Sequence, residues 1–373
     1  TKPALTALFS RLHGAPFAIV WWDGSQRQFG QGNPLFILHF AQEPDFGSED
    51  PILALGEAYM HGGLDIRGDW NALLDVLYRN RQLLDGPLAR MASVVRTLDR
   101  MRLKQKQKAN IAHHYDLGND FYRLWLDPSM SYSAAIYRDV DDGSLETAQH
   151  AKYRRILDRL AAEPGERVLE IGCGWGGFAE MATHDGLAVT GLTLSPAQLA
   201  WARQRVPSAD LRLQDYRDTT ERFDHVVSIE MFEAVGERWW PTYFRTVANA
   251  LKPEGRAVIQ SITIRDDLFA TYRRGTDFIQ QYIFPGGMLP SRAEFRAQAA
   301  RQGLVVRDEY AFGVDYARTL ALWRDAFDAK WPQIAALGFD EPFRRLWRLY
   351  LSYCEAGFLA GNIDVVQFEL ARA

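Results

Sequence analysis

The chain has 373 residues, about two and a half times the usual length of one domain, so we expect two domains. With 47% hydrophobic and 24% charged residues it has the composition of a globular protein, which excludes a mostly disordered chain. The 43 basic and 47 acidic residues give a net charge of −4, which argues against nucleic acid as a partner because no overall basic surface results.

The two cysteines, Cys173 and Cys354, are too few for a disulfide scaffold or a four-ligand zinc site. We therefore expect no metal and a reducing, cytoplasmic environment. The sequence lacks an apolar run of the roughly 18 residues that a spanning helix needs, and residues 1–11 lack the apolar core of a signal peptide. Any contact with a membrane is expected to be peripheral, at the inner surface.

Residues 1–95 form the first expected unit, a small α+β domain. Short apolar runs at 17–22 and 35–38 are separated by turn-forming residues, which predicts strands. The apolar spacing over 52–80 is that of a helix, interrupted by Gly62 and Gly63.

The stretch 96–110 is the expected linker between domains. Between residues 96 and 108 it holds six basic residues and one acidic residue, Asp99, a local charge of +5. Two interpretations are open: a solvated linker helix, or a patch that binds anionic lipid headgroups at roughly 1 kcal/mol per basic residue. Salt dependence of membrane binding would separate the two.

Residues 111–373 form the second expected domain, in which helices and strands alternate. A helix is predicted at 145–160, and apolar runs typical of buried strands follow. These strands are predicted at 167–171, 188–193, 224–230, 256–262 and 365–370. Strands separated by helices indicate βαβ units and a mostly parallel sheet.

A glycine-rich loop at 170–177 follows the first of these strands and precedes a helix, the context of a nucleotide-binding loop. A dinucleotide oxidoreductase would carry an acid near Thr193 to bind the ribose, and this chain has none there. Its acid precedes the glycines, at Glu170, where a carboxylate suits a cationic amino-acid group. S-adenosylmethionine is therefore favoured over NAD. The alternatives are an NAD-dependent oxidoreductase and a non-catalytic lipid-binding protein.

Several ordered blocks resemble the cyclopropane-fatty-acyl-phospholipid synthase family of methyltransferases. The blocks are 112–120, 132–133, 170–177, 191–195 with Gln198, 214–218, 228–233 and 282–286. Residues 17–69 also resemble the small N-terminal domain of that family, which is associated with lipid. The resemblance implies an α/β fold of the class I methyltransferase type, Rossmann-like, with a mostly parallel seven-stranded sheet.

The resemblance also implies which residues bind the cofactor. The glycines would contact its methionine part, the residues after the second strand its ribose, and the 214–218 block its adenine. The expected cofactor-binding residues are Tyr132, Ser133, Glu170, Gly172, Gly174, Thr193, Leu194, Gln198, Asp215 and Tyr216.

The implied reaction is methyl transfer to the double bond of an unsaturated acyl chain of a phospholipid at a membrane surface. Transfer leaves a carbocation, which must be shielded from water and must then lose a proton. The resemblance implies a bound bicarbonate as the base. Glu233, Tyr316 and the backbone of Ile262 match its expected partners, whereas Ala134 replaces a cysteine and Gln260 replaces a histidine.

These two departures leave the product open. Proton loss from the new methyl group closes a cyclopropane ring, and proton loss from a neighbouring carbon gives a methylene or methyl-branched unsaturated chain. The sequence also leaves open the acyl chain length, a phospholipid or a carrier-bound substrate, and the oligomeric state, for which a homodimer is one option.

Overall fold

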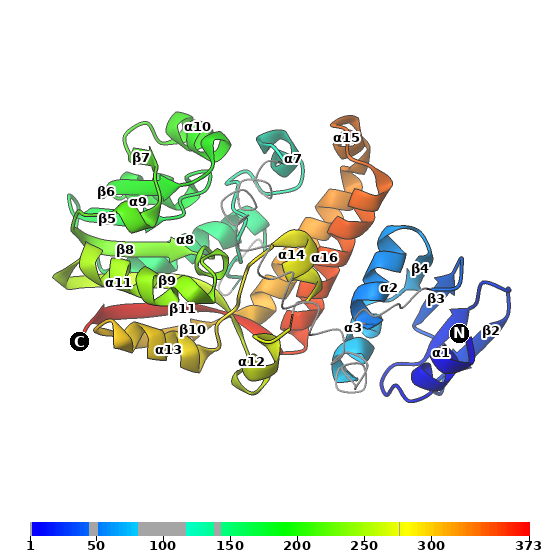
Figure 1. Cartoon of the computed structure of the whole chain (residues 1–373). Coiled ribbons are helices and arrows are strands. Elements are labelled where there is room, and N and C mark those ends of the chain that lie inside the picture. Colours follow the sequence, from blue (N-terminus) through cyan, green and yellow to red (C-terminus); the bar gives the residue numbers. More distant parts are fainter. Residues whose placement is uncertain (1, 45–50, 81–116, 138–142, 276) are drawn as a thin grey trace.

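The computed structural model describes residues 2–44, 51–80, 117–137, 143–275 and 277–373. In Figure 1 the N-terminal unit, in blue, and the large sheet, in green with one red strand, lie at opposite ends of the molecule. The long helices α14 (Gly313–Ala329) and α16 (Glu341–Leu359) lie between them. The predicted basic linker at 96–110 and the 112–116 part of the first family block lie outside the described residues.

The N-terminal unit combines three helices with a four-stranded sheet of order β2-β1-β3-β4. Its elements are α1 (Lys2–Phe9), β1 (Phe17–Val20), β2 (Gln26–Phe29), β3 (Phe36–Phe40), α2 (Pro51–Met60), β4 (Leu64–Gly68) and α3 (Trp70–Arg79). The mixed α+β character is as predicted. The predicted break at Gly62 and Gly63 in the helical stretch 52–80 is followed by a strand that was not predicted, β4, which pairs antiparallel with β3. Apolar spacing cannot show this strand, because cross-strand pairing with β3 determines it.

The large sheet has seven strands in the order β10-β11-β9-β8-β5-β6-β7. The strands are β5 (Arg167–Ile171), β6 (Ala188–Thr193), β7 (Asp210–Leu213), β8 (Phe223–Ile229), β9 (Leu251–Ile264), β10 (Leu304–Ala311) and β11 (Ile363–Arg372). Strands β5 to β9 pair in parallel, and β11 runs antiparallel to both of its neighbours. The predicted seven-stranded, mostly parallel sheet is confirmed. Strands β7 and β10 were not predicted, because each lies at an edge with partly exposed residues that lack a continuous apolar run.

Helices precede, connect and follow the strands of this sheet. They are α7 (Asn119–Arg123), α8 (Leu145–Leu160), α9 (Gly177–His184), α10 (Pro196–Arg205), α11 (Trp240–Ala250), α12 (Asp266–Tyr272), α13 (Arg292–Arg301) and α15 (Trp331–Ala336), in addition to α14 and α16. Helix α8 begins at the predicted residue because the Ser144 side chain accepts a hydrogen bond from the Thr147 amide, which caps the helix.

Helix α16 attaches the N-terminal unit to the rest of the chain. It packs against α2 and α3. The Tyr78 hydroxyl on α3 donates a hydrogen bond of 3.1 Å to the Tyr353 carbonyl on α16, and Arg345 donates one of 3.1 Å to the Tyr59 carbonyl on α2. The apolar core of the N-terminal unit continues onto Leu349 of the same helix. The two parts of the chain therefore share one packed interface.

Within the described ranges, the helices all fall short of the combined length and hydropathy required to cross a bilayer.

Candidate functional site

The glycine loop lies at the carboxyl ends of β5 and β6, where ligands bind in open α/β sheets. The amides of Gly172 and Cys173 both donate to the Leu192 carbonyl on β6, at 2.9 and 2.8 Å, which fixes the loop on the sheet. Gly174 has a φ of +51°. A Cβ atom built at Gly174 would meet no atom of the described chain within 4 Å, so this part of the loop faces open space.

That open space is a cavity of about 440 Å³, within the size range of small-molecule sites. All ten residues predicted to bind the cofactor line it, although they come from four segments of the chain. They are Tyr132, Ser133, Glu170, Gly172, Gly174, Thr193, Leu194, Gln198, Asp215 and Tyr216. The structure thus brings the predicted set together around one space, while the role of each residue in binding stays a prediction.

Glu170 lies one residue before the end of β5 and is the buried acid of this cavity, with 3% of its surface exposed. Its Oε2 atom has no hydrogen-bond partner among the described residues. Burial raises the pKa of Glu170 to about 8, since water no longer solvates the carboxylate. A cationic group in the cavity would satisfy this oxygen and favour the charged form, so the site fits the ammonium group of a bound amino-acid moiety.

Other lining residues are fixed by contacts within the chain. The Thr193 hydroxyl donates to Oε1 of Gln198 at 3.1 Å. Arg217 pairs with Asp215 at 2.5 Å, which holds this carboxylate at the cavity wall. Such contacts orient the side chains before a ligand binds.

Tyr132 and Ser133 lie on the opposite wall, in the segment between α7 and α8. The Tyr132 hydroxyl is hydrogen-bonded to the Tyr350 hydroxyl at 2.8 Å. The fully buried ammonium of Lys152 donates to the Ser133 Oγ atom at 2.6 Å. Burial lowers the pKa of Lys152 to about 8. A titratable cation therefore lies directly behind this wall.

A second cavity of about 170 Å³ adjoins the first. Tyr132, Glu230 and Ala234 line both. The walls of the second cavity are otherwise mainly aromatic and aliphatic. They include Ile264, Leu268, Phe284, Met288, Leu320 and Phe358. An apolar ligand in this second cavity would approach the contents of the first at Glu230.

The five residues predicted to be catalytic form two hydrogen-bonded groups. In the first, the Ile262 amide donates to Oε1 of Glu233, whose Oε2 atom has no partner among the described residues. Burial, and secondly the charge of Glu230, raise the pKa of Glu233 to about 8.

In the second group, Ala134, Gln260 and Tyr316 all donate to Glu230 and not to Glu233. Glu230 was not among the residues predicted to be functional, although it lies in the 228–233 block. The sequence feature that could have predicted Glu230 is its position at the end of a buried strand, three residues before Glu233.

The sequence model of a family described as mycolic acid cyclopropane synthetase matches residues 102–368. A domain of unknown function matches residues 4–84. The cyclopropane-fatty-acyl-phospholipid synthase of Escherichia coli strain K12 is 38% identical over 91% of this chain and 86% of its own length. The chain belongs to the cyclopropane synthase family.

Other members of the family agree with this assignment. The tuberculostearic acid methyltransferase of Mycobacterium tuberculosis is 36% identical over 96% of this chain and 88% of its own length. A solved mycolic acid cyclopropane synthase in complex with SAH and CTAB has 33% identity and a TM-score of 0.65, covering 70% of this chain and 97% of that protein.

As a member of the cyclopropane synthase family, the chain is a class I methyltransferase and uses S-adenosylmethionine as its cofactor. The preference for this cofactor over NAD is confirmed. The orphaned carboxylate oxygen of Glu170 and the open face of Gly174 both fit that molecule.

Proposed function

We propose that this protein transfers a methyl group from S-adenosylmethionine to the double bond of an unsaturated fatty acyl chain. The observation that carries the proposal is the meeting of two cavities at Tyr132 and Glu230, one with polar loops and one with apolar walls. In this arrangement the polar cavity suits a cofactor with a sulfonium methyl group, and the apolar cavity suits an alkene.

When bound, the cofactor supplies an electrophilic methyl group. Glu170 takes its ammonium group, and the backbone at Gly172 and Gly174 lies against its methionine part. Thr193, Leu194 and Gln198 contact the ribose, and Asp215 and Tyr216 the adenine. Tyr132 and Ser133 close the cavity from the opposite wall. Each assignment is supported by the position of the residue on the 440 Å³ cavity.

The residues around the second cavity exclude water from the cationic product of methyl transfer. The Tyr132 ring packs against the rings of Trp125 and Trp323, with centroids 5.6 and 5.3 Å away. Aromatic faces tolerate a neighbouring cation and admit little water. The chain therefore combines a shielded alkene pocket with polarizable walls.

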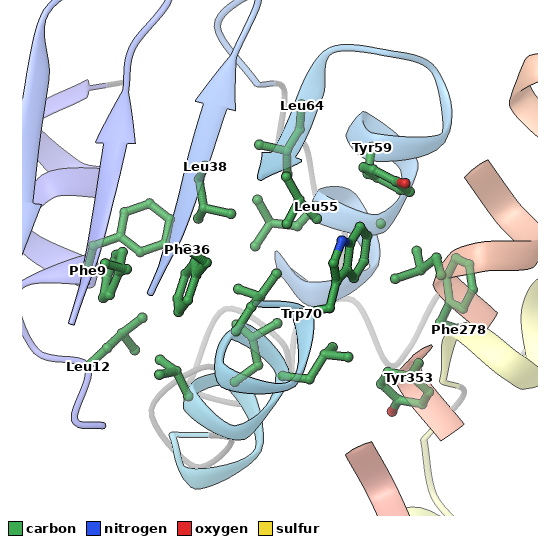
Figure 2. Close-up of a pocket in the computed structure, with 18 residues that line it drawn as sticks. Phe9, Leu12, Phe36, Leu38, Leu55, Tyr59, Leu64, Trp70, Phe278 and Tyr353 are labelled. Carbon is green, nitrogen blue, oxygen red and sulfur yellow. The ribbon is translucent and has the colours of Figure 1, made fainter. Parts of the chain in front are cut away.

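We also propose that the N-terminal unit serves the lipid part of the substrate, with residues 1–95 as a lipid-associated domain, 96–110 as a basic linker and 111–373 as the catalytic domain. Figure 2 shows apolar side chains of the N-terminal strands and helices directed toward one another around a small cavity, of about 60 Å³. Tyr353 lines both this cavity and the 170 Å³ cavity. This shared wall residue supports a functional connection between the two apolar cavities.

The preferred lipid is the acyl chain of a phospholipid reached from the membrane surface. The excess of five positive charges at 96–108 supports attraction to anionic headgroups. The protein would then bind the inner membrane surface peripherally and draw one unsaturated chain into the apolar cavity.

The test is incubation with labelled S-adenosylmethionine and vesicles of unsaturated phospholipid, followed by mass spectrometry of the released fatty acids. We expect labelled acyl chains that have gained one CH₂ group. Catalytic hydrogenation then separates a ring from a methylated olefin, because only the olefin takes up hydrogen under mild conditions. Saturated phospholipid vesicles are the control, and equal labelling of both kinds of vesicle would contradict the proposal.

A further inference from the structure

Glu230 lies at the end of β8 and contacts both cavities. Its Oε1 atom accepts hydrogen bonds from the Ala134 amide at 2.8 Å and from the Gln260 side chain at 2.7 Å. Its Oε2 atom accepts one from the Tyr316 hydroxyl at 2.8 Å. Three donors from the segment before α8, from β9 and from α14 therefore converge on one carboxylate.

These three donors belong to the group that the sequence resemblance assigned to a bound bicarbonate. The Ala134 amide and the Tyr316 hydroxyl have one hydrogen each, and both are already used by Glu230. The orientation of the Gln260 side-chain amide is fixed, because its Oε1 atom accepts a hydrogen bond of 3.0 Å from the Gln367 side chain while its nitrogen donates to Glu230. A bicarbonate ion at this point would lack its donors.

The charges also oppose a bound anion. Glu233 lies on the same cavity wall, and the charge of Glu230 already raises its pKa. A bicarbonate beside these two carboxyl groups would add a further negative charge to a poorly solvated site. Bicarbonate therefore does not fit the residues of this chain.

The backbone of Glu230 holds the carboxylate in this place. Its φ is +50°, a left-handed conformation that is strained for a residue other than glycine. Its amide donates to the Gln260 carbonyl at 2.8 Å, which fixes the turn at the end of β8. Strain of this kind persists where surrounding contacts hold it and is often found at functional sites.

We propose that the carboxylate of Glu230 is a built-in catalytic base that takes the place of a bound bicarbonate ion. This inference rests on the proposed methyl transfer to an acyl double bond. The alkene electron pair would form a C–C bond to the sulfonium methyl group as the S–CH₃ bond breaks, with S-adenosylhomocysteine as the leaving group, and the other alkene carbon would be left cationic. A C–H bond next to the cation then breaks, and its electron pair forms the new C–C bond of a ring or a new double bond. The proton goes to a carboxylate oxygen of Glu230.

The groups around Glu230 act on its pKa in both directions. Burial raises the pKa of Glu230 above its usual value, and the hydrogen bonds from Ala134 and Gln260, the charge of Lys152 and the hydrogen bond from Tyr316 limit that rise. The chain itself thus provides the groups that favour the charged form against burial.

The test compares the parent protein with Glu230→Gly in buffer freed of carbon dioxide and in buffer with added bicarbonate. We expect the parent rate of methylated-lipid formation to stay within twofold in the two buffers. Glu230→Gly relieves the left-handed strain and frees the three donors. We expect it to lose at least a hundredfold in turnover without bicarbonate and to recover at least tenfold when bicarbonate is added.

Glu230→Gln and Glu237→Gln complete the set. Glu230→Gln keeps the shape of the side chain but cannot act as the base, so it should be inactive in both buffers. Glu237→Gln is the control: Glu237 pairs with Arg273 outside the two cavities, so this variant should keep the parent rate. A parent rate that rises severalfold with bicarbonate, or parental turnover in Glu230→Gln, would overturn the inference.

A second measurement does not depend on turnover. Bicarbonate should raise the melting temperature of Glu230→Gly and leave that of the parent unchanged. Stabilisation of the parent by bicarbonate would contradict the inference even if the parent proved inactive on every lipid. Absence of methylated lipid in all buffers, with the expected melting behaviour, would count against the proposed function alone.

Discussion

The Tyr316 hydroxyl on α14 donates a hydrogen bond of 2.8 Å to the Glu230 carboxylate at the end of β8, across 86 residues of sequence. Tyr316 lines only the apolar cavity of this pair, whereas Glu230 lines both. The bond therefore couples the wall of the apolar cavity to a carboxylate that also lines the 440 Å³ cavity.

Removal of this bond by Tyr316→Phe should reduce kcat by about tenfold or more, because Glu230 loses a donor that orients it. Affinity for S-adenosylhomocysteine should change less than threefold, since Tyr316 does not line the cofactor cavity. Steady-state kinetics and calorimetry measure the two quantities. Tyr310→Phe, on the neighbouring β10 and outside both cavities, is the matched control, and an equal kcat loss there would refute the specific role of Tyr316.

Glu170→Gln should weaken cofactor binding at least tenfold, because the neutral amide cannot pair with the ammonium group. It should also stabilise the cofactor-free protein. The raised pKa of Glu170, about 8, means that the native state holds a proton which the unfolded chain releases near 4.5, so stability falls as pH rises between these values. The melting-temperature advantage of the variant should thus be larger at pH 8 than at pH 5. An advantage that shrinks as the pH rises would contradict the linkage.

Gly174→Val should abolish cofactor binding, since its side chain would enter the open face of the glycine loop. Gly303→Val is a matched control, because Gly303 also has a positive φ and open space around it but lies outside the described cavities. Both variants should lose comparable stability, and only Gly174→Val should lose binding in calorimetry. Retained affinity in a folded Gly174→Val would remove the loop from the binding site.

Lys152→Met should shift the acidic limb of the kcat profile to higher pH. The positive charge of Lys152 opposes the burial that raises the pKa of Glu230, so its loss raises that pKa further. A higher pH is then required to ionise Glu230. Rates measured from pH 6 to 9 test this, and a shift to lower pH would show that Lys152 acts in another way.

Charge reversal at Lys104, Lys106 and Lys108 should weaken binding to anionic vesicles severalfold at low salt and have little effect at high salt. Co-sedimentation with anionic and neutral vesicles measures it. Reversal of three exposed basic residues far along the sequence from this stretch, Arg222, Arg307 and Lys330, controls for overall charge. Equal binding by variant and parent would make the stretch a plain linker.

The sequence by itself determined the central part of the fold and the wall of the cofactor cavity. Strands β5 and β6 begin and end at the predicted residues, because buried parallel strands are short apolar runs with clear boundaries. The glycine loop follows β5 directly, so local spacing was enough to place Glu170, Gly172 and Gly174 together. Edge strands β7 and β10 and the paired strand β4 escaped prediction, because neighbours in the sheet define them.

Only the tertiary structure decided which carboxylate the predicted catalytic residues serve. Ala134, Gln260 and Tyr316 are 96, 30 and 86 residues from Glu230, and no local pattern expresses that convergence. The family resemblance of the sequence blocks implied Glu233 and a bicarbonate site. In the fold, the Glu230 side chain accepts hydrogen bonds from the donors that such an ion would use. Hydrogen bonds depend on positions in space, and at this site packing of β8, β9 and α14 sets those positions.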